Sequence, residues 1–269
     1  MNGPCKTIDE AVEQCPPNCN IFLAEGVYTL TKAITKPGLI FERLDNSKEV
    51  YIVGNKGPCV NVVLAPDEVV VFKKIIIMHS GLMMETLFKE NSSQEPKYRN
   101  KADKRAIQEF EIHPKVDCLF FIHSGRLNLK DCNLTFKSLP KKLKSKLTMI
   151  IARPGATLNM SNCDCTGNEH NHDAAVILIN ANAIISNCRF TSYGAGVIFT
   201  IAKPDNEVII QDNIIKDSLT IGIYVQGEGA KQLILRNTIS LISGPGVKST
   251  QGNAAKIKGN TISKCVIGI

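Results

Sequence analysis

An internal repeat in the second half of the chain limits the possible folds more than any other sequence feature. Six segments share the pattern apolar-x-apolar-x-polar-(Cys or Asn)-x-(apolar or small). The Cys or Asn position, here called the marked column, recurs at Cys132, Cys163, Cys188, Asn213, Asn237 and Asn260, with spacings of 31, 25, 25, 24 and 23 residues. A period of this length indicates a solenoid, in which each repeat buries its apolar face against its neighbours.

A second column of residues follows the later marked positions by eight or nine residues. Its members are Gly196-Val197-Ile198, Gly222-Ile223-Tyr224, Gly246-Val247-Lys248 and Gly268-Ile269. Each repeat therefore contains at least two short strands joined by a turn, and these strands are too closely spaced for crossover helices. The pattern predicts an all-β fold, a right-handed parallel β-helix. In this fold an inward Asn can bond the backbone of adjacent coils, and Cys can fill the same small space.

The first half of the chain begins with a helix signal. Thr7 and Glu10 form a capping-box pattern, and Ile8, Ala11, Val12 and Cys15 make one apolar helical face. We expect this short helix to cover the open end of the core. Strands are then expected at Ile21–Ala24, Val27–Thr31, Gly38–Glu42, Glu49–Val53, Val60–Leu64 and Val69–Met78.

Two charged stretches interrupt the repeat, at residues 85–116 and 137–148. Because both lack the strand pattern, we interpret them as insertions that project from one β-helix domain spanning residues 1–269. The repeat pattern also starts a new strand at Val266 just before the chain stops. We therefore expect further coils in the natural protein beyond residue 269, since an uncapped end exposes strand edges.

The composition argues against several classes of protein. There is no run of 18 apolar residues and no apolar stretch near the N-terminus, so neither a membrane span nor an export signal is expected. The ten cysteines are then expected to be free, mostly buried thiols in a reducing compartment. The net charge of +7 is concentrated locally and aromatic residues are only 6%, which does not favour nucleic acid as a partner.

The segment 7–30, TIDEAVEQCPPNCNIFLAEGVYTL, resembles the opening of the pectin-lyase-like, right-handed β-helix superfamily. The Asn-Thr-Ile-Ser segments at 237–240 and 260–263 also look like its coils. This resemblance implies the fold across nearly the whole chain but not one activity, because the superfamily holds lyases, hydrolases, epimerases, esterases and non-enzymes. In character the chain is most similar to intracellular eukaryotic members, such as the spindle-associated Shc-binding proteins and β-helix proteins of cilia.

The catalytic motifs of these enzymes are missing. The paired aspartates, Gly-His-Gly and Arg-Ile-Lys of polygalacturonases do not occur, and Asp212-Asn213, the nearest approach, belongs to the repeat. A column of oxygen-bearing side chains precedes the marked column, at Asp131, Asn162, Asn187 and Asp212. Calcium would need six to eight oxygens. Asp and Asn are also the residues that tight turns prefer, so we interpret this column as structural.

One polar cluster could carry chemistry. Asp164, Glu169, His170, His172 and Asp173 could act in acid–base catalysis or hold zinc, although a solvated loop is the simpler interpretation. Asp164, His170, His172 and Asp173 are therefore the candidates if the chain is an enzyme. The pairs Cys163/Cys165 and Cys15/Cys19 lack the partners that zinc requires, so no metal or cofactor is expected.

The basic cluster of the second insertion comprises Lys137, Lys141, Lys142, Lys144 and Lys146, and it is the candidate dock for an acidic partner protein such as tubulin. Two functions follow. The first is a non-catalytic scaffold in a cytoplasmic assembly, with the cytoskeleton or a cilium as its setting. The alternative is a polysaccharide-active enzyme, a lyase, hydrolase or epimerase that binds carbohydrate.

Overall fold

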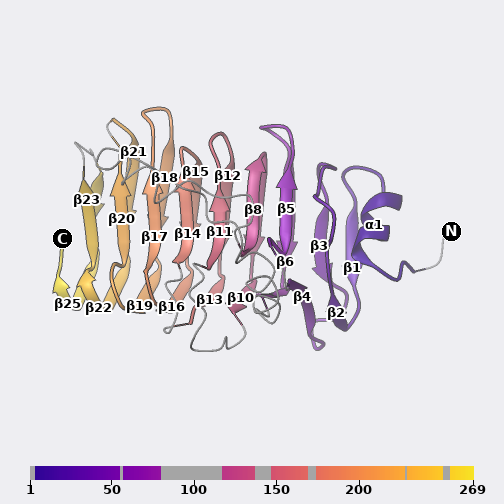
Figure 1. Ribbon diagram of the computed structural model, residues 1–269, viewed down its shortest axis with the longest axis horizontal. Helices are drawn as coiled ribbons and strands as arrows, with labels where there is room; N and C mark the ends of the chain where they lie inside the picture. The colour runs from indigo at the N-terminus through magenta and orange to yellow at the C-terminus, as the bar shows by residue number, and fades with distance from the viewer. Residues whose placement is uncertain are drawn as a thin grey trace, which may run out of the picture.

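The protein is a rod of stacked coils with a helix at its N-terminal end (Figure 1). The structure is a computed structural model, and it describes residues 4–54, 57–79, 117–136, 147–168, 174–227, 229–250 and 255–269. These residues form one helix, α1 (Ile8–Gln14), and three sheets in which the strands pair in parallel with strands of the next coil. A full coil contributes one strand to each sheet. This confirms the predicted all-β solenoid.

Each sheet is a ladder of strands that follow one another along the rod. Sheet 1 has nine strands: β1 (Asn20–Leu23), β3 (Ile40–Arg43), β6 (Val69–Lys73), β9 (Arg126–Lys130), β12 (Thr157–Ser161), β15 (Asn182–Ser186), β18 (Glu207–Gln211), β21 (Lys231–Leu235) and β24 (Lys256–Lys258). Sheet 2 also has nine: β2 (Gly26–Tyr28), β4 (Val50–Gly54), β7 (Ile76–His79), β10 (Asn133–Phe136), β13 (Asp164–Thr166), β16 (Arg189–Tyr193), β19 (Ile214–Ser218), β22 (Thr238–Pro245) and β25 (Thr261–Ile267). Sheet 3 has seven: β5 (Val60–Val63), β8 (Cys118–Ser124), β11 (Thr148–Ala152), β14 (Ala174–Ile179), β17 (Gly196–Ile201), β20 (Ile223–Gln226) and β23 (Val247–Thr250).

The helix α1 forms where the capping signal predicts it. The Thr7 hydroxyl accepts a hydrogen bond from the Glu10 backbone N–H at 3.1 Å, and the Glu10 carboxylate accepts one from the Lys6 backbone N–H at 3.0 Å. Ile8 is buried in the core, and the partly buried Ala11, Val12 and Cys15 pack against it. Because this apolar face lies on the first coil, the helix caps the core as expected.

The marked column points into the rod. Cys132, Cys163, Cys188, Asn213 and Asn237 are all buried. The Asn237 carboxamide oxygen accepts hydrogen bonds from the backbone N–H and the side-chain amide of Asn213, each at 3.0 Å. The amide of Asn237 in turn donates to the Ile210 carbonyl at 2.9 Å. The predicted stacking of Asn side chains between coils is therefore confirmed.

The residue before the marked column turns the chain from sheet 1 into sheet 2. Its φ is positive in successive coils, at Asp131 (54°), Asn162 (53°), Asn187 (54°), Asp212 (57°) and Arg236 (54°). Asn and Asp tolerate this left-handed conformation better than other residues with a side chain. The interpretation of the oxygen-bearing column as a turn column is therefore correct.

The other strands predicted in the first half are shifted by one to three residues at their ends, and three further predictions differ from the structure. The strand expected at Val69–Met78 is two strands, β6 and β7, because Lys74 adopts a positive φ of 55° and turns the chain. The second insertion was predicted to run to residue 148, but Thr148 already begins β11. Val266 and Ile267 do not begin a strand; they complete β25, in which Ile267 pairs with Pro245 of β22.

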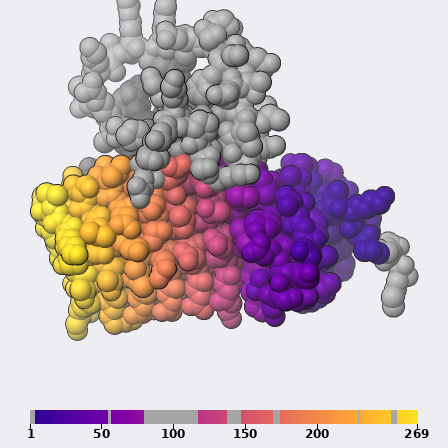
Figure 2. All heavy atoms as spheres, turned by 90° about the horizontal axis from the view of Figure 1, so that it is seen from below, coloured from indigo at the N-terminus to yellow at the C-terminus, as the bar shows by residue number. Residues whose placement is uncertain are grey.

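All ten thiols are free, as the composition predicts. Six of them, at Cys59, Cys118, Cys132, Cys163, Cys165 and Cys188, are buried, while Cys5 is exposed. Among the described residues, no helix is long and apolar enough to cross a membrane. The side of the rod seen in Figure 2 presents its coils in chain order, from indigo near α1 to yellow at the last coil.

Candidate functional site

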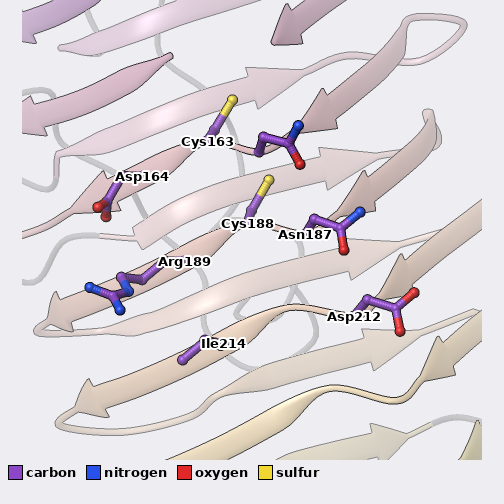
Figure 3. Close-up of a pocket in the computed structure, with 8 residues that line it drawn as sticks. Cys163, Asp164, Asn187, Cys188, Arg189, Asp212 and Ile214 are labelled. Atoms are coloured by element: carbon purple, nitrogen blue, oxygen red, sulfur yellow. The ribbon is translucent and has the colours of Figure 1, made fainter. Parts of the chain in front are cut away.

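A shallow hollow lies on the corner where sheet 1 turns into sheet 2. Its volume is about 420 Å³, and it is open to solvent along three consecutive coils. The residues that line it are Asn162, Cys163, Asp164, Asn187, Cys188, Arg189, Asp212 and Ile214. Asn187 and Asp212 lie on successive turns, while Asp164, Arg189 and Ile214 lie beside them on sheet 2 (Figure 3).

The repeat itself builds this hollow. In each coil the turn residue points outward, the marked residue points inward, and the next residue begins a strand of sheet 2 with its side chain outward. Asp164 pairs in register with Arg189, which pairs in register with Ile214. Because parallel strands lie about 4.8 Å apart, these side chains follow one another at that interval along the rod.

One carboxylate at the edge of the hollow is paired. The Arg236 guanidinium donates two hydrogen bonds to Asp212, from Nε to Oδ1 and from Nη2 to Oδ2, both at 2.7 Å. These hydrogen bonds hold the pKa of Asp212 below its ordinary value. Asp212 is therefore ionised at neutral pH, with both carboxylate oxygens bonded to Arg236, and is not available as a general acid.

The other charged groups of the hollow are unpaired within the described part of the chain. Asp164 and Arg189 are opposite in charge and adjacent in register, yet they form no ion pair there, and both are exposed. The side chain of Asn187 likewise makes no hydrogen bond to any described residue. Unused donors and acceptors therefore stand side by side on neighbouring coils.

A column of hydroxyl groups borders the hollow on sheet 2. It lies two residues beyond the first strand residue of each coil, and in-register positions hold Thr135, Thr166, Thr191, Lys216, Ser240 and Ser263. Thr135 donates to the Phe136 carbonyl at 3.4 Å. Thr166 and Thr191, beside the hollow, make no side-chain hydrogen bond to any described residue.

Of the predicted enzymatic residues, the structure describes one. Asp164 is the first residue of β13 and lies in the hollow, exposed. Glu169, His170, His172 and Asp173 lie outside the described residues, as do Lys137, Lys141, Lys142, Lys144 and Lys146, so both groups remain predictions. Sequence reasoning missed Arg189 and Thr191, although a register of 25 residues places them one coil beyond Asp164 and Thr166.

The outer face of sheet 3 carries a different surface. An in-register column of apolar side chains faces outward there, consisting of Phe121, Ile151, Ile177, Phe199 and Tyr224, followed by Lys248. Phe121 and Ile151 join Cys118 in a small buried cluster separate from the main core, and Ile177 and Tyr224 are half-buried. The seven strands of this sheet contain no Asp or Glu.

A buried polar group lies where β7 ends. His79 is fully buried, its Nε2 lies 3.2 Å from the Gly57 carbonyl oxygen and 3.9 Å from the Asp117 carboxylate, and burial lowers its pKa. Asp117 accepts a hydrogen bond from the Gly57 backbone N–H at 2.8 Å. No group of three or more His, Cys, Asp or Glu side chains in the described residues is placed to hold a metal ion.

The comparisons with known proteins concern the architecture. Residues 148–269 match the family model described as "Right handed beta helix region". The solenoid is a right-handed parallel β-helix. Pectin methylesterase PemA from Erwinia chrysanthemi has a TM-score of 0.43 and 11% identity, over 96% of this chain and 88% of that one. The pectin methylesterase from Yersinia enterocolitica has a TM-score of 0.41 and 10% identity, over 96% and 94%. No curated protein matches the sequence.

Proposed function

We propose that this β-helix is a non-catalytic binding scaffold, a rod whose outer faces hold partners in register. The arrangement of its charged side chains carries this proposal. In the hollow they stand with polar neighbours in two columns, the turn column and the first residues of the sheet 2 strands, and the hollow itself is shallow. An enzyme of this fold would instead need carboxylates and a cation that converge on one reacting atom.

The chemistry of the hollow supports binding rather than bond cleavage. A general acid at neutral pH needs a raised pKa, whereas the two hydrogen bonds from Arg236 lower the pKa of Asp212. The thiols of Cys163 and Cys188 belong to the residues that line the hollow, but each residue is only 2% exposed. They are therefore shielded from a substrate and are poor nucleophiles towards it.

The partner that we propose for the scaffold is a protein with an acidic surface, such as tubulin. Sheet 3 supports this choice, because its strands contain no acidic residue and its outer column ends in Lys248. The lysine cluster at 137–146 is the proposed dock, in a cytoplasmic, cytoskeletal or ciliary assembly. A relationship to the intracellular eukaryotic β-helix proteins, of the spindle-associated Shc-binding kind, belongs to the same proposal.

Co-sedimentation with microtubules tests the protein partner. The full chain should pellet with microtubules at low salt and remain in the supernatant at high salt, because an electrostatic contact is screened. A variant with Lys141, Lys142 and Lys144 changed to Glu should lose most of this binding. A matched variant with Lys73, Lys130 and Lys256 of sheet 1 changed to Glu should retain it. Binding that is equal in both variants would exclude the lysine cluster as the dock.

A second candidate function is a polysaccharide-active enzyme. The observation that favours it is Asp164, an exposed carboxylate one coil from the unpaired Arg189. Incubation with polygalacturonate and with methyl-esterified pectin, followed for unsaturated product and for released methanol, tests it. Turnover that disappears in Asp164→Asn but survives in Asp205→Asn, an exposed carboxylate outside the hollow, would establish the enzyme and refute the scaffold.

A further inference from the structure

We propose that Cys15 and Cys19 form a reversible disulfide, which fastens the capping helix α1 to the first strand of the rod when the surroundings become oxidising. The oxidant is a small disulfide of the glutathione class. This inference goes beyond the scaffold function proposed above and does not depend on it. Three properties of the described residues carry it. They are the position of the two cysteines, their access to solvent and the weak attachment of α1.

The two cysteines stand at the junction between the cap and the rod. The helix α1 ends at Gln14, Cys15 is its C-cap, and Cys19 directly precedes β1. Figure 1 shows α1 beside β1 at the N-terminal end of the rod. Both cysteines are partly buried and pack against the same core cluster. A bond between them would therefore join the end of the helix to the start of the first coil.

The loop between the two cysteines keeps their thiols near each other. Its two prolines each have a fixed φ, which leaves the loop few conformations. Asn18 adopts a positive φ of 58°, and its backbone N–H donates to the Pro37 carbonyl at 3.0 Å, which fixes the turn into β1. Burial and the neighbouring Cys19 thiol together raise the pKa of Cys15 to about 11, so the two thiols lie within interacting distance.

The reaction begins at Cys19. A thiolate is the attacking species, and the raised pKa of Cys15 keeps that thiol protonated. The Cys19 thiolate therefore attacks one sulfur of glutathione disulfide, whose S–S bond breaks to release a first glutathione thiolate. Cys15 then loses its proton to solvent and attacks the sulfur of Cys19, which releases the second glutathione. The two cysteines are oxidised to a disulfide, and one glutathione disulfide is reduced to two thiols.

Access to solvent distinguishes this pair from the other cysteines. Six cysteines are buried, so a small disulfide does not reach them in the folded chain. Cys5 is exposed, but its thiol donates to the Gln14 side chain at 3.7 Å. Cys265 is partly buried and belongs to the last coil, at the other end of the rod. The accessible cysteines thus include one pair whose thiols interact, Cys15 and Cys19.

The helix α1 is weakly attached to the rod. It has seven residues, too few to be stable alone, and only Ile8 among them is buried. Its polar contacts with the rod are exposed. Asp9 accepts a hydrogen bond from the Thr31 backbone N–H at 3.1 Å, and Lys36 donates one to the Glu13 carbonyl at 2.7 Å. A disulfide reduces the number of open conformations available to the cap and so stabilises the closed one.

Oxidation of the full chain, followed by peptide mass mapping, tests the inference. After incubation with glutathione disulfide, the chain should lose two of its ten free thiols, and the mapping should find Cys15 linked to Cys19. Reduction with dithiothreitol should restore both thiols. In circular dichroism melts, the oxidised chain should unfold a few degrees above the reduced chain, because the cap is fastened.

Two single variants assign the roles of the thiols. Cys15→Ser should stop at the mixed disulfide of Cys19 with glutathione. Cys19→Ser should form much less mixed disulfide, because burial still raises the pKa of Cys15. Neither variant should melt higher after oxidation. The matched control is Cys5→Ser, which removes an exposed thiol at the same end of the rod and should oxidise as the native chain does.

A chain that keeps ten free thiols in excess glutathione disulfide would overturn the inference. A disulfide that joins Cys5 to either cysteine would do the same, as would a Cys15–Cys19 disulfide that leaves the melting temperature unchanged. Mixed disulfide formed equally in both single variants would refute Cys19 as the attacking thiol. All of these results leave the scaffold proposal standing, because it does not use these thiols.

Discussion

A single amide in the marked column uses all of its hydrogen-bonding capacity. The Asn237 oxygen accepts two hydrogen bonds from Asn213, and its nitrogen donates to the Ile210 carbonyl and to the Asn260 oxygen. A side-chain amide has two donors and two lone pairs, so Asn237 makes all four of its possible hydrogen bonds. This residue therefore joins three successive coils at one buried point.

Replacing this amide tests its contribution to stability. Asn237→Ala should lower the free energy of unfolding by about 3 kcal/mol, because buried groups on Asn213 and Ile210 lose their partners. Urea unfolding followed by circular dichroism measures the change. Thr238→Ala, at the exposed neighbouring position, is the control and should have little effect. Equal losses in both variants would show that the stacked amides do not stabilise the coil.

The Arg236 guanidinium controls the titration of Asp212. The variant Arg236→Asn keeps a residue that tolerates positive φ but removes the charge, so the pKa of Asp212 should rise towards its ordinary value. In the native protein this pKa is lowered, so the pair's contribution to stability is present above the unfolded-state pKa. It is lost as the pH falls through the folded-state pKa. Carboxyl NMR titration of both proteins measures the shift, and an unchanged pKa would contradict the assignment.

At the scale of the turn, the marked column changes from Cys to Asn between Cys188 and Asn213. The effect of a Cys→Asn substitution should therefore depend on the residue that the next coil holds in this column. The Asn213 oxygen already accepts a hydrogen bond from the Cys188 backbone N–H at 2.9 Å and has a second lone pair to offer. The side-chain N–H introduced by Cys188→Asn can donate a hydrogen bond to this lone pair, so this variant should be nearly as stable as the native chain. The amide introduced by Cys163→Asn would instead face the thiol of Cys188, so one of its buried N–H groups lacks an acceptor. The free energy of unfolding should therefore fall by about 1–3 kcal/mol more in Cys163→Asn than in Cys188→Asn.

Urea midpoints of the two variants give the comparison. Cys163→Ala and Cys188→Ala serve as controls for loss of the thiol alone. If Cys163→Asn proved as stable as Cys188→Asn, an Asn in the marked column would not need the Asn oxygen of the next coil as its acceptor, and the prediction would be wrong.

The repeat shows why some elements are predictable from sequence and others are not. The inward marked column and α1 follow from local patterns, an apolar alternation and the Thr7–Glu10 cap. The division of Val69–Met78 into two strands has no such signal, because Lys74 adopts a conformation usually left to Asn or Gly. The hollow is likewise a product of register. Asp164 was found as part of a local polar stretch, whereas Arg189 becomes its neighbour only when coils 25 residues apart are stacked.

At the scale of the whole molecule, the burial of the thiols predicts their reactivity. Cys5 is exposed, and Cys15, Cys19 and Cys265 are partly buried, so at most these four should react with an aromatic disulfide reagent in the native state. Burial, together with the nearby Asp117 charge, raises the pKa of Cys59 to about 12, and burial is the main cause of the raised pKa of Cys165. Both shifts suppress the reactive thiolate. All ten should react after unfolding in guanidinium. Fewer than ten in unfolded, unreduced protein would reveal disulfides and contradict the free-thiol assignment.

The in-register pairing of successive coils also bears on how such a chain can change its length. The strands β15, β18 and β21 present the same edges to their neighbours, and Asn213 and Asn237 make equivalent hydrogen bonds. A tandem duplication or deletion of one coil's worth of coding sequence would therefore leave the flanking edges complementary. Such a change alters the length of the rod by a whole coil and keeps the packing of the core. The number of equivalent positions on each face changes with it.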